Sequence, residues 1–226
     1  AYDNSNGVFL DTIDKVTIEN NRVLKNSRNG FWAIVISNAT ITNNHFINNS
    51  VSAIQTNYFS NVIFDNNLAE NNTYHGFDLF ISEFSEFTNN IAKGNGLTGF
   101  MLADITNSSV GNNIAENNGN DEWIRGMFTN GMSENNIFHG NYVENGMQIS
   151  GTNTLIYDNV IQDGLTILNA DLSTTEDNTI EGTVLISRGN DYTTFRNNEV
   201  NSEDNALELI SFNMGDCGSE GLVIEN

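Results

Sequence analysis

The densest group of titratable side chains lies in the segment Tyr74-His75-Gly76-Phe77-Asp78. Asp104 and Arg125 follow it along the chain. A carboxylate, an imidazole or a phenol can take up or release a proton, and a guanidinium can neutralise the carboxylate of a substrate. These residue types favour abstraction of a proton from a carbon next to a carboxylate. The alternative is that His75 and its neighbours have a structural role.

A repeated unit positions these residues. The same corner pattern, ending in asparagine, recurs every 23 residues and then at steps of 28, 18, 19 and 20; its marks are Asn21, Asn44, Asn67, Asn90, Asn113, Asn141, Asn159, Asn178 and Asn198. Short apolar runs with period-2 alternation separate the marks, which is typical of strands joined by turns. The repeat predicts an all-β fold, a right-handed parallel β-helix of about nine to ten coils, in which one asparagine of each coil stacks into a ladder while its own backbone takes the bend.

The composition agrees with this architecture. The chain has 226 residues, of which 42 are asparagine and none is proline, and 38% are hydrophobic. Proline cannot donate to a hydrogen-bonded ladder, and no fixed leucine pattern supports a leucine-rich repeat. We expect residues 1–226 to form a single β-helix domain that is a module of a longer chain. Neither end shows a capping segment, so flanking domains or another subunit would cover the ends.

The charge restricts the partners. Eight basic against 29 acidic side chains give a net charge of −21, which argues against nucleic acid. No run approaches the roughly 20 apolar residues of a membrane span. Scattered acidic side chains fit an extracellular or cell-surface location. They could also hold Ca²⁺, although no spacing identifies a metal site and no motif indicates an organic cofactor.

Alternation along the strands predicts which side chains face outward. A second mark at Gly7, Gly30, Ala53, Gly76, Gly99 and Gly126 is followed each time by a large apolar residue, which we expect to point inward. The second and fourth residues of each strand then point outward. Candidate substrate-binding residues on or near this face are Trp32, Gln55, Phe80, Lys93, Met101 and Phe128. Apolar plates beside amide and carboxyl groups suit a sugar chain; the alternative is a covering loop, domain or subunit.

The segment His75-Gly76-Phe77-Asp78, followed by Asn95–Phe100 and by Ala103-Asp104, resembles the catalytic module of the mannuronan C5-epimerases. The likeness covers roughly residues 74–210. It implies a secreted, calcium-using β-helix enzyme that converts D-mannuronate to L-guluronate within alginate.

Carried over by position, Asp78 and Asp104 match the acidic residues of the family motif. The family tyrosine is replaced by His75 here, and the later family histidine falls at Arg125. The resemblance then implies His75 or Tyr74 as acid or base, with Arg125 neutralising the uronate.

Two classes of function follow. One is a polysaccharide-acting enzyme, epimerase-like or a polyuronate lyase. The other is a non-catalytic glycan-binding module, or a structural β-helix of surface, adhesin or tail type. Net negative charge repels a polyuronate at long range, and only local cations such as Lys93 and Arg125, or bound Ca²⁺, would offset it.

Overall fold

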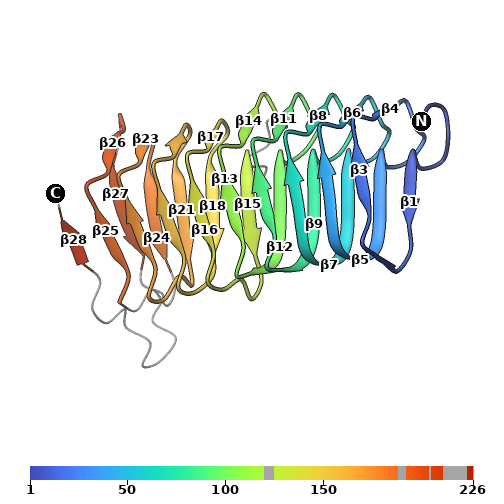
Figure 1. The fold of residues 1–226 in the computed structure, drawn as a ribbon. Helices are drawn as coiled ribbons and strands as arrows, with labels where there is room; N and C mark the ends of the chain where they lie inside the picture. The colour runs from blue at the N-terminus through green and yellow to red at the C-terminus, as the bar shows by residue number, and fades with distance from the viewer. Residues whose placement is uncertain (120–124, 188–191, 204, 211–222, 226) are drawn as a thin grey trace.

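A computed structural model describes residues 1–119, 125–187, 192–203, 205–210 and 223–225. Within these residues the chain forms strands and turns and has no helix, so it offers no helix that could cross a membrane. Figure 1 shows the strands stacked side by side in chain order from β1 to β28, with N and C at opposite ends of the stack. The prediction of an all-β parallel β-helix is confirmed.

Each coil contributes to three parallel faces. Face 1 follows the glycine marks and contains β1 (Val8–Leu10), the first part of β5 (Phe31–Thr42), the first part of β7 (Ile54–Asp65), β9 (Phe77–Glu83), β12 (Phe100–Thr106), β15 (Met127–Asn130), β18 (Met147–Ser150), β21 (Leu165–Leu168), β24 (Val184–Ser187) and β27 (Leu207–Ile210). Face 2 contains β3 (Thr17–Glu19), the second parts of β5 and β7, β10 (Glu86–Thr88), β13 (Ser109–Gly111), β16 (Ile137–His139), β19 (Leu155–Tyr157), β22 (Thr174–Glu176), β25 (Thr194–Arg196) and β28 (Val223–Glu225). Between faces 1 and 2, β2 (Ile13–Asp14) pairs with the middle of β5. Face 3 contains β4 (Arg22–Leu24), β6 (His45–Ile47), β8 (Leu68–Glu70), β11 (Ile91–Lys93), β14 (Ile114–Glu116), β17 (Tyr142–Val143), β20 (Val160–Ile161), β23 (Thr179–Glu181) and β26 (Glu199–Asn201).

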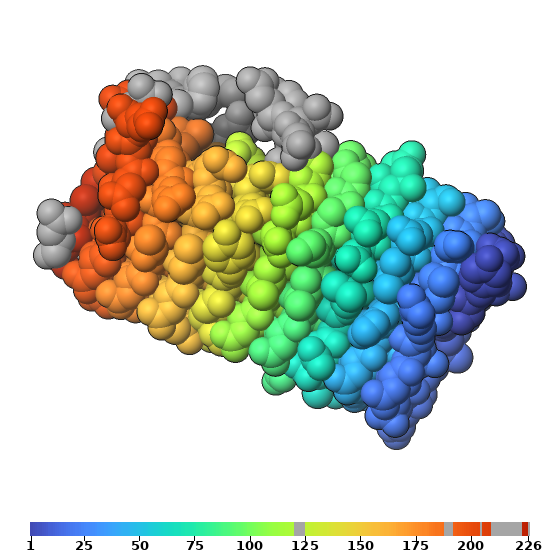
Figure 2. Space-filling view, turned by 90° about the horizontal axis from the view of Figure 1, so that it is seen from above, coloured from blue at the N-terminus to red at the C-terminus, as the bar shows by residue number. Residues whose placement is uncertain are grey.

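The register follows the repeat. On face 1, Phe31 pairs with Ile54 and Ile54 with Phe77, a shift of 23 residues at each step. Seen from above, the coils form parallel bands in chain order (Figure 2). The parallel solenoid that we predicted is shown, and ten strands, from β1 to β27, stack on face 1 within the described residues.

The core is a continuous column of inward-pointing side chains. The large residue after each glycine mark is buried, as alternation predicted: Phe31, Ile54, Phe77, Phe100 and Met127 are all at most 1% exposed. Equivalent aromatic rings stack from coil to coil, with centroids 4.7 Å apart for Phe77 and Phe100. This spacing matches the strand separation of a sheet, ~4.8 Å, so the backbone register itself brings the rings into contact.

The asparagine ladder is confirmed. Of the two adjacent asparagines in a coil, one makes the bend and the next makes the ladder hydrogen bonds. Asn66 takes a positive φ of 51° and makes the bend, which asparagine tolerates better than most residues. Asn67 then points inward, where its Nδ2 donates to Asn90 Oδ1 (3.0 Å) and to the Ile41 carbonyl (2.8 Å). The bend therefore belongs to the residue before the ladder position, not to the ladder residue as we expected.

A second ladder was not predicted. It lies five residues after the first in each coil and contains Asn26, Asn49, Asn72, Asn95 and Asn118. In each link Nδ2 donates to Oδ1 of the next asparagine at 2.9 Å. The signal was present in the sequence, because the pairs Asn48-Asn49 and Asn71-Asn72 repeat the 23-residue spacing. The two ladders hold the two ends of each face 3 strand and so fix the corner that leads into face 1.

Candidate functional site

The outward side chains at the second position of each face 1 strand form one continuous row. This outer row contains Phe9, Trp32, Gln55, Asp78, Met101, Phe128 and Gln148, each paired in register with the next. Neighbours are separated by the strand spacing of ~4.8 Å. The predicted binding residues Trp32, Gln55, Met101 and Phe128 therefore lie on one line with Asp78 at its middle.

Aromatic groups lie on both sides of the central carboxylate. The rings of Trp32 and Phe9 are tilted by 42° to each other with centroids 4.9 Å apart, and the Arg28 guanidinium lies 5.6 Å from the indole centroid. Phe9 is half exposed. Phe128 is two coils beyond Asp78 on the opposite side. Phe80 lies in β9 two residues after Asp78, beside Ala103 of β12. The predicted mixture of aromatic and polar groups on this face is thus present.

Asp78 is buried although it lies on the outer side of the sheet. Asp78 is only 6% exposed. Gln55 Nε2 donates to Asp78 Oδ2 at 3.1 Å, and the Ser52 hydroxyl is a second hydrogen-bond partner. Burial raises the pKa of Asp78 from 3.8 to about 6, and the two hydrogen bonds only partly oppose this shift. The carboxyl group can therefore take up and release a proton at mildly acidic pH.

His75 and Tyr74 lie at the corner that precedes Asp78. His75 is partly buried, and its Nδ1 is buried without a hydrogen-bond partner. Burial lowers the pKa of His75, an effect that the main chain of Thr98 partly opposes, so the imidazole is held in its neutral form. Tyr74 is 48% exposed. Asp78, His75 and Tyr74 therefore share one corner of one coil.

Asp104 lies apart from this group. It is on the adjacent strand β12 but level with Ile81, three residues further along the strand than Asp78, or ~10 Å. Its Oδ1 accepts a hydrogen bond of 2.7 Å from the Met132 amide. Asp104 is thus one coil beyond Asp78 but does not face it, because a positive φ of 53° places Asp104 at a bend within β12.

Arg125 and Lys93 are also directed elsewhere. Arg125 precedes Gly126 two coils beyond His75, and a Cβ placed on Gly146 would lie 3.0 Å from Arg125 Nη1. The guanidinium thus extends toward the next coil and away from Asp78. Lys93 is on face 3, where Nζ pairs with Glu116 Oε1 at 3.1 Å. The prediction that Lys93 lies on or near face 1 is wrong, because Lys93 ends a face 3 strand and the chain turns a corner before the next face 1 strand begins.

Two polar residues of the site were missed from the sequence. Asn29 is 3% exposed and Ser52 is 1% exposed. They precede the glycine or alanine marks in the two coils before His75, so Asn29, Ser52 and His75 form a column with a spacing of 23 residues. The 23-residue spacing of these three positions is the sequence signal for this column.

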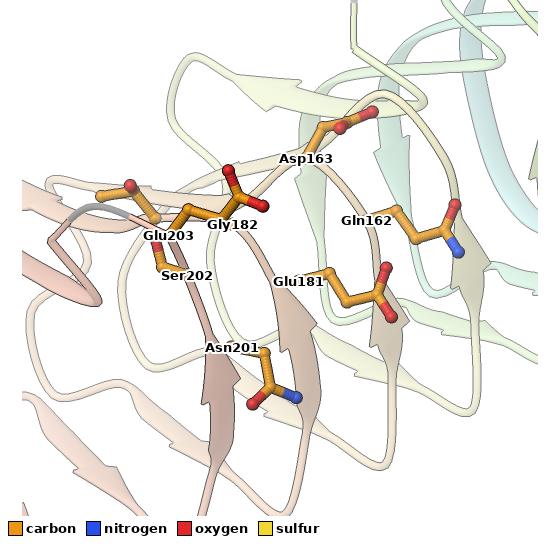
Figure 3. Close-up of a pocket in the computed structure, with 8 residues that line it drawn as sticks. Gln162, Asp163, Glu181, Gly182, Asn201, Ser202 and Glu203 are labelled. Carbon is orange, nitrogen blue, oxygen red and sulfur yellow. The ribbon is translucent and has the colours of Figure 1, made fainter.

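A cavity lies in the C-terminal coils, far from Asp78. It is a cavity of about 680 Å³ at the corner between face 3 and face 1, lined by Gln162, Asp163, Glu181, Gly182, Thr183, Asn201, Ser202 and Glu203. Figure 3 shows Glu181 and Asn201 on neighbouring coils along its wall. Among the described residues, no cluster of three or more His, Cys, Asp or Glu side chains is arranged to hold a metal ion.

Comparison with known proteins places the fold. Residues 1–143 match the family described as "right handed beta helix region". Three solved structures are similar at low sequence identity. The A-module of the mannuronan C-5 epimerase AlgE4 from Azotobacter vinelandii is 14% identical with a TM-score of 0.41, covering 88% of this chain and 81% of that chain. The AlgE6 A-module from the same organism is 13% identical with a TM-score of 0.32, covering 96% and 80%. The fluoroquinolone resistance protein QnrB1 is 12% identical with a TM-score of 0.37, covering 90% and 92%. No curated protein is significantly similar to the chain.

Proposed function

Because this chain belongs to the right-handed β-helix family, we propose that its outer row binds a polysaccharide and that Asp78 exchanges a proton with the bound sugar. One observation carries the proposal. A carboxyl group with a pKa raised to about 6 lies in the middle of a row that has exposed or half-buried apolar side chains on both sides. An aspartate that is buried on an otherwise accessible face costs stability, and such perturbed groups gather at functional sites.

The proposed reaction begins with the ionised form of Asp78. Its carboxylate takes the proton from the carbon next to a uronate carboxylate, so that a C–H bond breaks, an O–H bond forms and the electron pair moves into the uronate carboxyl group. Return of a proton to the opposite side of the carbon gives the epimer. Loss of the glycosidic oxygen from the neighbouring carbon gives an unsaturated sugar. In both cases a water molecule supplies the second proton, because His75 at the same corner is held neutral, and the hydroxide that remains takes the proton from Asp78.

The substrate class that we propose is a polyuronate such as alginate, outside the cell or at its surface. Stabilisation of the negative charge that develops on the uronate is the weakest part of the arrangement, because Arg125 and Lys93 are directed away from Asp78.

A second candidate is a glycan-binding module without catalysis. The specific observation that favours it is the separation of Asp104 and Arg125 from Asp78. In this case the outer row binds the polymer through Trp32 and Phe128, and Asp78 contributes a hydrogen bond only.

Proton exchange with solvent separates the two candidates. The protein is incubated in D₂O, with and without Ca²⁺, with polymannuronate, polyguluronate and polygalacturonate, and NMR follows deuterium at the carbon next to the carboxylate. Ultraviolet absorbance follows unsaturated products. Exchange or elimination that disappears in Asp78→Asn but persists in Lys93→Ala, on face 3, is the result expected for the enzyme. Binding in affinity electrophoresis without exchange indicates the module, and neither binding nor exchange refutes both.

A further inference from the structure

A line of hydrogen bonds with a single direction ends at Asp78. It begins at the main-chain N–H of Ser52, which donates to Asn29 Oδ1 at 3.1 Å. Asn29 Nδ2 donates to Gln55 Oε1 at 2.9 Å, and Gln55 Nε2 donates to Asp78 Oδ2 at 3.1 Å. The first link runs back from the coil of Ser52 and Gln55 to the coil of Asn29, and the next two run forward through Gln55 to the coil of Asp78.

The first donor determines the orientation of every amide in the line. A main-chain N–H can only donate, so the side-chain atom of Asn29 that faces Ser52 has to be its oxygen. The nitrogen of Asn29 then faces Gln55, and for the same reason the oxygen of Gln55 faces Asn29. Gln55 is left with its NH₂ group toward Asp78. Reversing either amide would bring two acceptors or two donors together, which costs about 1–3 kcal/mol per unpaired buried group.

The line distinguishes the two oxygens of Asp78. Oδ2 always faces a donor, so a proton on the neutral acid cannot sit on Oδ2 without losing that hydrogen bond. We propose that Asn29 is a positioning residue which, through Gln55, reserves Asp78 Oδ2 as a hydrogen-bond acceptor and leaves Oδ1 as the oxygen that carries and transfers the proton. This inference deepens the proposed function and rests on it for the identity of the reacting group.

The hydrogen bonds of Asp78 act on its pKa without competition from a charged neighbour. Gln55 of β7 and Met101 of β12 flank Asp78 in register, and Ser52 from the corner before β7 is a further hydrogen-bond partner. None of these three side chains is charged. The pKa of Asp78 is set by burial and by its hydrogen bonds to Gln55 and Ser52, without a contribution from a charged neighbour. Removing the donor that faces Oδ2 should therefore act directly on the titration of Asp78.

The test measures this titration in the whole chain without any substrate. Carboxyl ¹³C NMR of protein labelled at aspartate follows Asp78, whose signal is assigned by its loss in Asp78→Asn. Gln55→Leu is expected to raise the pKa of Asp78 by on the order of one unit, a tenfold change in the ratio of acid to carboxylate. Asn29→Leu is expected to raise it in the same direction, because Gln55 is then free to turn. Gln148→Leu, which removes an amide from the same row ~14 Å away, is the matched control and leaves it unchanged.

The double variant decides whether Asn29 acts through Gln55. In the Gln55→Leu background, Asn29→Leu is expected to cause no further shift, whereas additive shifts would overturn the proposal. An unchanged titration in folded Asn29→Leu would also overturn it, since a purely structural asparagine lowers stability without moving the pKa of Asp78. If Asn29→Leu does not fold, Gln55→Leu on the outer face still tests the last link, and no shift there refutes the line. Lack of turnover on every polymer would refute the proposed function while leaving this titration result standing.

Discussion

Replacing Asp78 by asparagine should make the protein more stable at neutral pH. The folded state raises the pKa of Asp78 from 3.8 to about 6, so between these pH values it holds more protons than the unfolded state. The free energy of unfolding therefore falls as pH rises through this window. A shift of about two units, at about 1.4 kcal/mol per unit, amounts to ~3 kcal/mol. Asparagine is neutral at every pH and still presents an oxygen to Gln55 Nε2, so Asp78→Asn avoids this cost.

The assay is urea denaturation of both proteins from about pH 4 to neutral pH. Only the difference between them is interpreted, because the other titratable groups contribute equally to both. We expect the two stabilities to be similar near pH 4 and to separate up to about pH 6, with the variant higher by ~2–3 kcal/mol above that. A difference that does not change with pH, or a variant that is less stable at neutral pH, would refute the assignment of Asp78 as a buried carboxyl group with a raised pKa.

Three further predictions concern the scaffold and the binding face. Asn67→Ala removes two hydrogen bonds that Asn67 accepts from Asn44 and two that its Nδ2 donates, so urea denaturation should show a loss of about 4 kcal/mol. The adjacent exposed Asn66→Gly should cost about 1 kcal/mol or less, and equal losses would contradict the division of roles. Gly131→Ala should lower thermal stability by about 1–3 kcal/mol, because φ is +77° and the added Cβ collides with Asp104; an unchanged melting temperature would argue against that contact. Lys93→Ala should change glycan affinity by less than about twofold, measured by affinity electrophoresis, since its ion pair is exposed on face 3; a large loss would restore Lys93 to the binding site.

The fold could be predicted because one short-range rule repeats along the chain. The 23-residue period and the alternation after each glycine mark were enough to place Phe31, Phe77 and Phe100 inside and Trp32 outside. A β-helix adds each coil to the previous one, so a local pattern is also a map of spatial neighbours. The bend was predicted at the wrong residue of each asparagine pair. Asparagine tolerates a positive φ and can also form a side-chain ladder, so the sequence Asn-Asn does not show which residue does which.

The candidate site was only partly predictable, because it depends on side-chain direction across corners. The row of Trp32, Gln55, Asp78 and Phe128 follows from register alone and was found. The position of Lys93 was wrong because a separation of a few residues in the chain can include a turn onto another face. The direction of Arg125 depends on the glycine in the next coil, which leaves room for the guanidinium, and nothing in the spacing of the charged residues reveals that.

The two asparagine ladders make the solenoid a polar rod. In every link the amide nitrogen faces the C-terminal neighbour and the oxygen faces the N-terminal one, from Asn21 to Asn198 in the longer ladder. Each side-chain amide has a dipole comparable with that of a peptide unit, ~3.5 D, and aligned dipoles add as they do in a helix. The N-terminal coils therefore lie at the negative end of both ladders. Four of the chain's eight basic residues, Lys15, Arg22, Lys25 and Arg28, lie in the first 28 residues, where positive charge offsets this potential.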